Sequence, residues 1–327
     1  MKLSTKKALA AAGEGATPDK TAQLDVSGKG ITSISSLELP ALRKLNLAQN
    51  RLTALQGLEK CPLVTYLQAS HNEIADGAEG LVGVRALRDL MVLNLSNNQL
   101  EHIPPLVFGR MRQLQALVLN NNSIADVPAK WFTRGLLGLN TLVLSHNKLE
   151  SLSGAGLERL MGLTKLSVSH NMLQELPDLS RCRRLRELRA AHNRLQHIPP
   201  WLAKMKHVHT LDLGHNSIGH ADKSQSWEEV ERLARLPGLM VLSLAGNPLQ
   251  TAEGADGEDG EDGPDPGDSY TARIKALFPR LKAQDGHRVL MKKSHGHVKQ
   301  SRGEREEERE EGPVAAGLGT RKKVKKR

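Results

Sequence analysis

The chain repeats an eight-residue pattern of the form LxLxxNxL, in which x is a variable residue. Ten copies align on their first apolar residue, at positions 24, 45, 67, 93, 117, 142, 166, 188, 211 and 242. The copies start 21 to 26 residues apart, except that the last starts 31 residues after its predecessor. A repeat of roughly 20 to 29 residues is typical of stacked, quasi-one-dimensional architectures rather than of an ordinary globular core.

The pattern itself predicts the local structure of each copy. Its first and third positions alternate as in a short β-strand, so both apolar side chains point to one side. Stacking such strands in parallel buries that side. The fold class expected is α/β, a curved leucine-rich-repeat solenoid of about ten repeats with a parallel concave sheet. One repeat buries about five aliphatic side chains at about 1.5 to 3 kcal/mol each, which is too little to order roughly 23 residues, so many copies are needed.

The sixth position of the pattern is asparagine in nine of the ten copies, and Lys29 takes its place in the first. An asparagine side chain has one acceptor oxygen and two N–H donors, so a single buried copy can satisfy backbone groups of its own turn and of the next. We therefore predict a structural asparagine ladder. It consists of Asn50, Asn72, Asn98, Asn122, Asn147, Asn171, Asn193, Asn216 and Asn247.

Composition shifts divide the chain into segments. Residues 251–269 carry eight acidic residues and no large apolar side chain. The stretch that follows can form a helix that closes the last repeat, because its apolar residues lie on one side: Tyr270, Ile274, Leu277, Phe278 and Leu281. The predicted boundaries are 1–20 for an N-terminal segment, partly helical or flexible, 21–250 for the solenoid, 251–269 for an acidic flexible loop, 270–290 for a C-terminal cap and 291–327 for a charged disordered tail.

Cysteine content and the termini lead to a prediction of location. Cys61 and Cys182 are too few for a disulfide framework, and neither a signal peptide nor a membrane-spanning stretch is apparent. The last seven residues, RKKVKKR, include six basic ones and resemble a nuclear import signal at Lys322, Lys323, Lys325 and Lys326. We expect a nuclear or nucleolar protein, with the cytoplasm as the alternative, that is not secreted, has no membrane contact and could bind nucleic acid through this tail.

No catalytic motif is recognisable, so we predict that the chain is not an enzyme and needs no cofactor. Histidine is the one tempting constellation, because it precedes the asparagine in five copies, at His71, His146, His170, His192 and His215. Four of these lie in consecutive repeats, close enough for two imidazoles to share a metal ion. Other polar residues fill the same position elsewhere, so we interpret it as a tolerant polar slot and predict no metal site.

Function must then come from the surface that the repeats present. Residues beside the inward leucines line the concave sheet, which is the usual binding surface of solenoids. We predict that it binds a protein partner through a small apolar patch and a neighbouring charged patch. The residues of this predicted site are Tyr66, Val92, Asn94, Val118, Val143, Lys165, Glu187, Arg189 and Asp212.

Two resemblances extend this interpretation. Repeats such as LNLAQNRLTALQGLEKCPLVTY resemble those of the leucine-rich-repeat regulator of type-one protein phosphatase. The stretch SYTARIKALFPRLKAQDG resembles the cap of intracellular leucine-rich-repeat proteins, including the leucine-rich-repeat subunits of nuclear ribonucleoproteins, although Gln284 stands where that cap prefers leucine. The leading prediction is a monomeric, non-enzymatic, nuclear scaffold for a protein partner. The resemblances imply two alternatives: a phosphatase regulatory subunit, and a ribonucleoprotein-associated or nucleic-acid-binding protein.

Overall fold

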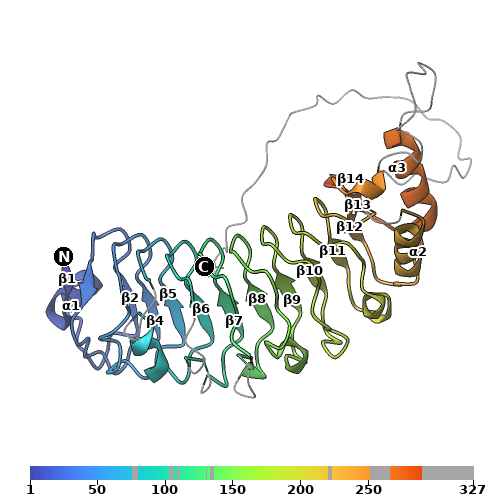
Figure 1. Ribbon diagram of the computed structural model, residues 1–327. Helices are drawn as coiled ribbons and strands as arrows, with labels where there is room; N and C mark the ends of the chain where they lie inside the picture. The colour runs from blue at the N-terminus through green and yellow to red at the C-terminus, as the bar shows by residue number, and fades with distance from the viewer. Residues whose placement is uncertain are drawn as a thin grey trace, which may run out of the picture. The chain divides into compact units, whose positions relative to one another are not determined.

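The ten copies of the pattern form ten neighbouring strands of one sheet. The computed structural model describes residues 1–75, 80–102, 107–108, 111–129, 131–132, 136–219, 223–250 and 266–288. Figure 1 shows the strands side by side along a curved row of coils. They are β2 (Gln23–Asp25), β4 (Lys44–Asn46), β5 (Tyr66–Gln68), β6 (Val92–Asn94), β7 (Ala116–Val118), β8 (Thr141–Val143), β9 (Lys165–Ser167), β10 (Glu187–Arg189), β11 (Thr210–Asp212) and β12 (Val241–Ser243).

All ten strands pair in parallel and in the same register. The first leucine of each copy lies opposite the first leucine of the next, as Leu142 does between Leu117 and Leu166. Each of these three leucines is fully buried. The in-register stacking places identical apolar side chains on top of one another and makes one continuous core, so the predicted parallel leucine-rich-repeat solenoid is confirmed.

The return segments between strands are loops and short helices. They include the 3-10 helices η1 (Val82–Ala86), η3 (Leu157–Arg159), η4 (Pro200–Lys204) and η5 (Pro248–Gln250). One longer helix, α2 (Lys223–Leu233), accounts for the spacing of 31 residues before the last copy. Its Val230 and Trp227 are buried, so the insertion extends the core instead of projecting from it.

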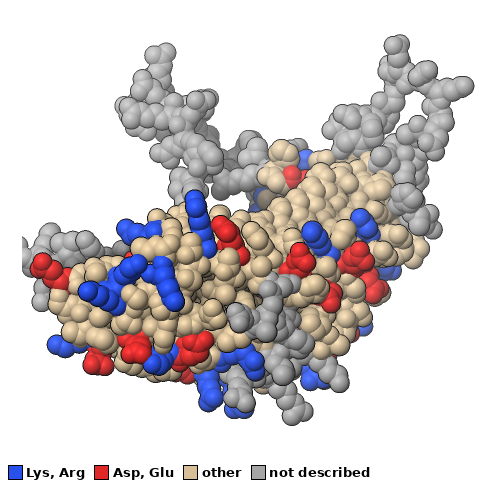
Figure 2. Space-filling view, turned by 60° about the vertical axis from the view of Figure 1, so that its left-hand side comes forward, with Lys and Arg blue, Asp and Glu red and all other residues tan. Residues whose placement is uncertain are grey.

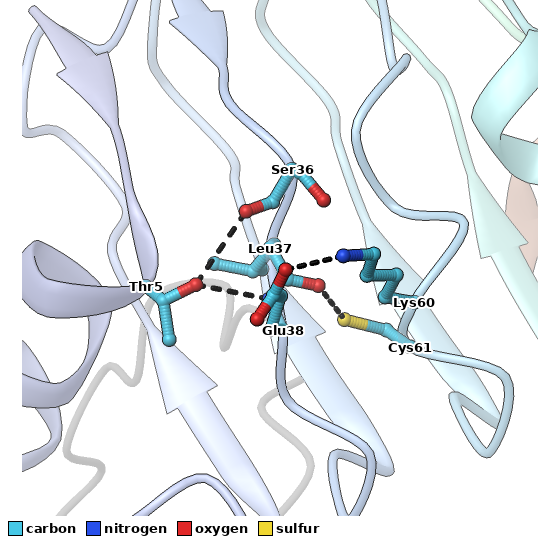
Figure 3. Close-up of polar contacts among 6 residues, drawn as sticks. All are labelled: Thr5, Ser36, Leu37, Glu38, Lys60 and Cys61. Carbon is cyan, nitrogen blue, oxygen red and sulfur yellow. Dashed lines mark hydrogen bonds and ion pairs between the residues drawn. The ribbon is translucent and has the colours of Figure 1, made fainter.

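The first coil is covered by the N-terminus. Strand β1 (Lys2–Leu3) pairs with β3 (Ser33–Ile34), and helix α1 (Thr5–Ala12) follows. Figure 3 shows Thr5, at the start of this helix, beside the segment that carries Glu38. The Thr5 hydroxyl accepts a hydrogen bond from the Glu38 N–H at 3.0 Å. Leu3 and Ala8 are fully buried. Residues 1–12 therefore close the open end of the core.

The contacts continue from that cap into the second coil. Glu38 forms an ion pair with Lys60, and the Cys61 thiol donates to the Leu37 carbonyl at 3.1 Å (Figure 3). Cys61 and Cys182 are both buried free thiols, as expected from their count. Burial raises the pKa of the Cys182 thiol to about 11, so this thiol is protonated at neutral pH and unreactive as a nucleophile.

The last coil is covered by a helix and two short strands. Helix α3 (Pro266–Leu277) buries Tyr270 and Ile274 against the core. Strand β13 (Ala283–Gln284) pairs in parallel with β12 and in antiparallel with β14 (His287–Arg288). The sequence had suggested the helix, starting later at residue 270, but not these strands. A two-residue strand is too short to show a periodic pattern in the sequence. β13 forms only because it pairs with β12.

One aspartate connects the two parts of this cap. The carboxylate of Asp285 accepts hydrogen bonds from the backbone N–H groups of Leu244 and Ala245, at 2.8 and 2.9 Å, and from the Tyr270 hydroxyl at 3.1 Å. The neighbouring Gln284 is buried in the position where the resembled cap has leucine, and its amide also donates to Asp285. The polar residue is thus accommodated because its amide has a partner.

Two predicted segments lie largely outside the described residues. These are the acidic stretch, of which residues 251–265 are not described, and the tail from residue 289 onward, which includes Lys322, Lys323, Lys325 and Lys326. Nothing structural follows for them, and the functional site is built from the solenoid alone.

Candidate functional site: the concave face of the sheet

The candidate site is the face of the sheet formed by the residues on either side of each inward leucine. In every strand from β2 to β12 that carries the repeat, the central leucine is buried. The residues before and after it are exposed or half-exposed, apart from the buried Ser167. Strand alternation causes this division, because successive side chains point to opposite faces. We call this surface the concave face.

The predicted apolar residues gather on four neighbouring strands of the concave face. Val118 on β7 lies directly opposite Val143 on β8. In the adjoining column Val92 lies between Tyr66 and Ala116. Tyr66 is 39% exposed although it is a large aromatic residue. These five side chains form the apolar patch; Ala116 was missed in the sequence, although its position one residue before the inward leucine could have identified it.

The predicted charged residues lie on the next strands along. Glu187 on β10 bridges two cations: its Oε1 lies 3.1 Å from the Lys165 Nζ and 2.7 Å from the Arg189 Nε. The Arg189 side chain is half-exposed and that of Glu187 is mostly buried. Asp212 lies opposite Arg189 in the register, but its Oδ1 accepts from the Gly214 N–H at 3.3 Å. Lys165, Glu187 and Arg189 thus form the charged cluster, next to Asp212.

Polar residues at the other end of the face bond to the neighbouring strand or within their own turns. The Asn46 amide donates to the Asp25 carboxylate at 3.0 Å, and the Asn94 oxygen accepts from the Ser96 N–H at 2.9 Å. The backbone N–H and hydroxyl of Ser27 hold the pKa of the Asp25 carboxyl below its ordinary value. Asn94, a predicted contact residue, therefore has its carbonyl committed to its own loop and its N–H₂ group available.

Side-chain amides of the asparagine ladder bond to the backbone. Asn171 is representative: its Oδ1 accepts from the Leu149 N–H, and its Nδ2 donates to the carbonyls of Leu144 and Val168, all within 2.9 to 3.0 Å. The same pattern of one acceptor bond and two or more donor bonds recurs at Asn72, Asn98, Asn122, Asn147, Asn193 and Asn216. Asn50 and Asn247 at the two ends do likewise. These side-chain amides are engaged in hydrogen bonds to the backbone, so they are not binding groups for a substrate.

The residue before each ladder asparagine has a left-handed backbone. The φ angle there lies between 52° and 57° for every non-glycine residue, including His71 and His146. Most L-residues avoid this region, whereas asparagine, histidine and glycine enter it more readily. The position is therefore not the tolerant slot that we had interpreted it as. Its fillings, which include only glutamine, asparagine, histidine and glycine in the ten copies, were the signal that could have shown this.

Four of the five histidines in this position stack on one another. The ring centroids of His146 and His170 are 4.0 Å apart, those of His170 and His192 are 4.1 Å apart, and those of His192 and His215 are 4.2 Å apart, with interplanar angles of 9° to 14°. All four residues are exposed. We call this row the histidine ladder. Because nitrogen lone pairs lie in the ring plane, nearly parallel rings cannot direct them at one metal ion.

The stacking is visible in the acid–base behaviour of the two inner rings. Partial burial, followed by the neighbouring His146 and His192, holds the pKa of His170 below its ordinary value of 6.5. Burial and His215 lower the pKa of His192 in the same way. Asp212 acts in the opposite direction on both rings, since its negative charge favours the protonated form. The two inner rings thus resist protonation in the free protein.

A second concavity lies among the return loops. A cleft of about 760 Å³ is lined by Glu150, Glu175, His197 and residues of the adjoining loops, and it reaches Glu229 of α2. The buried Glu229 carboxylate accepts from the Ile198 N–H at 2.7 Å and lies 3.4 Å from the His197 Nδ1. Sequence analysis did not predict this cleft. The Glu229 contacts fix α2 to the preceding loop, which is a structural role.

Within the ranges that the structure describes, no group of three or more histidine, cysteine, aspartate or glutamate side chains is arranged to hold a metal ion. In the same ranges no helix is long and apolar enough to cross a membrane. Figure 2 shows, on the side in view, basic and acidic side chains interspersed on a surface where other residues predominate.

Comparison with known proteins supports the repeat architecture. Family models described as leucine-rich repeat match residues 84–124, 112–173 and 204–221. The chain is 31% identical to mouse podocan-like protein 1 over 65% of this chain and 41% of that protein, and 35% identical to rabbit fibromodulin over 36% of this chain and 74% of that sequence. It therefore spans less than half the length of the first of these relatives. The functional domain of InlJ from Listeria monocytogenes has the same fold, with a TM-score of 0.53, 20% identity and coverage of 81% of this chain and 53% of that one.

Two of these proteins contradict the predicted location. Podocan-like protein 1 and fibromodulin are small leucine-rich proteoglycans, which are secreted proteins of the extracellular matrix. The prediction of a nuclear or nucleolar protein, with the cytoplasm as the alternative and secretion excluded, is wrong. It depended on a short basic cluster and on a low cysteine count, and neither is a property of the folded solenoid. A cluster such as Lys322–Lys326 occurs often by chance, and two buried thiols are compatible with more than one compartment.

Proposed function

Because the chain belongs to the leucine-rich-repeat family, we propose that it is a monomeric, non-enzymatic scaffold that binds a protein partner through its concave face. The observation that carries this proposal is the juxtaposition of the apolar patch on β5 to β8 with the charged cluster on β9 and β10. An apolar centre beside polar and charged groups is the usual composition of a protein interface. The families of its relatives are non-enzymatic, which agrees with this role.

The apolar patch supplies the area that a partner would cover. Val118 and Val143 remain half-exposed on a flat surface of short side chains, and Tyr66 stands at its edge. Aromatic residues at such an edge contribute large contact areas with few rotatable bonds. A partner therefore needs an apolar side chain, or a short row of them, that can lie against β6 to β8.

The charged cluster supplies orientation. Glu187 holds Lys165 and Arg189 on the face, so their positions are set before a partner arrives. Pre-positioned charges reduce the side-chain entropy lost on binding and select a partner with complementary charge. Arg189, whose side chain is half-exposed, is the member most available to an incoming carboxylate.

Binding can be tested with glutamate substitutions at different places on the solenoid. The tagged full-length chain and its Val143→Glu, Lys165→Glu and Leu137→Glu variants would be incubated with extract and medium of the cells that produce it, and bound proteins quantified by mass spectrometry. Leu137 is 53% exposed on a return loop, so it controls for a new surface charge. A partner lost with Val143→Glu and Lys165→Glu but kept with Leu137→Glu supports the proposal; equal capture by all four proteins contradicts it.

The same experiment discriminates the alternatives. A phosphatase regulatory subunit requires that the captured protein be a metallophosphatase and that charge reversal at Arg189 or Asp212 release it. A nucleic-acid or ribonucleoprotein role requires capture that nuclease treatment or deletion of residues 321–327 abolishes, with a steep dependence on salt. No described contact favours either alternative over the concave-face scaffold.

A further inference from the structure

The histidine ladder lies at the edge of the concave face and has no role in the core. His146 follows Val143 by three residues in the same repeat, so the ladder begins at the repeat where the apolar patch ends. It then continues over the repeats that carry Arg189 and Asp212. Its members are exposed, whereas the neighbouring ladder of asparagines satisfies the backbone. The left-handed backbone favours asparagine, glycine and histidine at the position before the ladder asparagine. Neither this backbone nor the core requires four histidines in succession.

Protonation would change this row from neutral to cationic. Neighbouring ring centroids are 4.0 to 4.2 Å apart, so positive charges on adjacent rings would repel one another. The charged groups that act on the inner rings are the other imidazoles, which oppose protonation, and Asp212 of β11, which favours it. For His170, the negative charge of Asp212 does not offset the opposing effect of the three other imidazoles. A carboxylate supplied by a partner would add the missing negative charge.

From this geometry we propose that the histidine ladder is a proton-gated docking strip for an acidic polypeptide segment of the partner. This inference rests on the proposed function, because the same partner would occupy the concave face. Unprotonated imidazoles carry no charge and offer no electrostatic attraction to a carboxylate. Below the ordinary titration range of histidine, carboxylates of the partner lower the repulsion between adjacent rings. Proton uptake and binding are then linked, so each favours the other.

The dimensions and surroundings of the row favour a polypeptide over other polyanions. Four rings at these spacings are about as long as four residues of an extended chain, which rises roughly 3.3 Å per residue. The column beside the histidines, formed by Ser145, Ser169, Ala191 and Gly214, carries no large side chain. A segment that crosses from Val143 to His146 meets valine and then imidazole, and a polypeptide can present an apolar side chain and a carboxylate in that order.

The test uses a synthetic fluorescein-labelled peptide with two leucines followed by four glutamates. Its affinity for the full-length protein would be measured by fluorescence anisotropy at pH 7.5 and pH 5.5 at constant ionic strength. We expect binding about tenfold tighter at pH 5.5 for each unit by which the bound carboxylates raise a histidine pKa. The decisive variant carries His→Asn at 146, 170, 192 and 215, and the matched control is His71→Asn, which changes the same backbone position outside the row.

Asparagine is the appropriate replacement because it already fills this position at Asn97 and Asn121 with the same positive φ. Loss of the pH dependence in the fourfold variant, with retention in His71→Asn, supports the proposal. Retention in both overturns it. If the fourfold variant does not fold, His170→Asn with His192→Asn replaces it and should reduce the pH dependence by at least half. A peptide with glutamine for glutamate that binds equally well, or a polyphosphate that binds as tightly at pH 5.5, also overturns the assignment.

The outcomes separate this inference from the proposed function. The concave-face test uses Val143→Glu and Lys165→Glu and reads partner capture at neutral pH, without acidification. Capture that depends on those residues, together with an acid response that survives the fourfold variant, leaves the scaffold standing and removes the docking strip. Equal capture by all concave-face variants removes the scaffold, and with it the partner that the strip would hold.

Discussion

The side-chain amide of Asn171 donates a hydrogen bond to the backbone carbonyl of Leu144, one repeat earlier in the chain, at 3.0 Å. The same side chain also accepts from the Leu149 N–H of that repeat. One buried residue thus joins two coils through groups that no strand pairing reaches. Stability of the solenoid therefore depends on these amides as well as on its leucines.

Replacing Asn171 by alanine should destabilise the protein markedly. The change leaves the Leu149 N–H buried without a partner, at about 1 to 3 kcal/mol, and removes the donor bonds to the Leu144 and Val168 carbonyls, at about 0.5 to 1.5 kcal/mol each. We expect the free energy of unfolding, measured by urea denaturation, to fall by roughly 2 to 4 kcal/mol. Asn46→Ala on the concave face is the matched control and should cost about 1 kcal/mol, because water can replace its exposed bonds. If the free energy of unfolding fell equally in the two variants, the ladder asparagines would contribute no more to stability than an exposed asparagine does.

The left-handed backbone makes a prediction at His71, which has no stacked histidine neighbour. His71→Val places a β-branched side chain at φ 54° and should cost about 1 to 2 kcal/mol. His71→Asn should change stability by less than about 0.5 kcal/mol, since asparagine tolerates this conformation. Both variants are compared with the wild type by chemical denaturation. A valine variant as stable as the asparagine variant would mean that the loop can relax out of the left-handed region.

The C-terminal cap should open when Asp285 is replaced. Asp285→Ala removes the acceptor of the Leu244 and Ala245 N–H groups and of the Tyr270 hydroxyl. We expect faster amide hydrogen exchange in β12 and β13, with little change in β4 to β6, because each repeat contacts only its neighbours. Tyr270→Phe removes only one of the hydrogen bonds to Asp285 and should have a smaller effect at the same sites. Uniformly faster exchange along the whole solenoid would contradict this local view.

The histidine ladder should make stability depend on pH. The pKa values of His170 and His192 are lowered in the folded protein, so the unfolded chain binds more protons once the pH falls below the ordinary value of 6.5. The free energy of unfolding then decreases with acidification until the folded pKa values are passed. The double variant His170→Asn, His192→Asn should lose less thermal stability between pH 7.5 and pH 5 than the wild type, measured by circular dichroism. His71→Asn should follow the wild-type curve.

The period and the alternation of leucines were sufficient to predict the coil and the ten strands with the correct residues in the interior. They sufficed because each repeat contacts only the next, so a local pattern is also the tertiary pattern. The acidic stretch and the basic tail had no such constraint. The prediction of location that depended on the tail was the one that the relatives overturned.

The repeated pattern from Leu24 to Leu242 thus determined which side chains are buried, because alternation along each strand places its leucines on the inner face. Only the tertiary structure decided which exposed residues meet. Glu187 bridges Lys165 and Arg189 across two strands, and His146 to His215 stack although 22 to 24 residues separate each from the next. These contacts arise from the rise between coils and the left-handed turn, which set side-chain separations that no single repeat encodes.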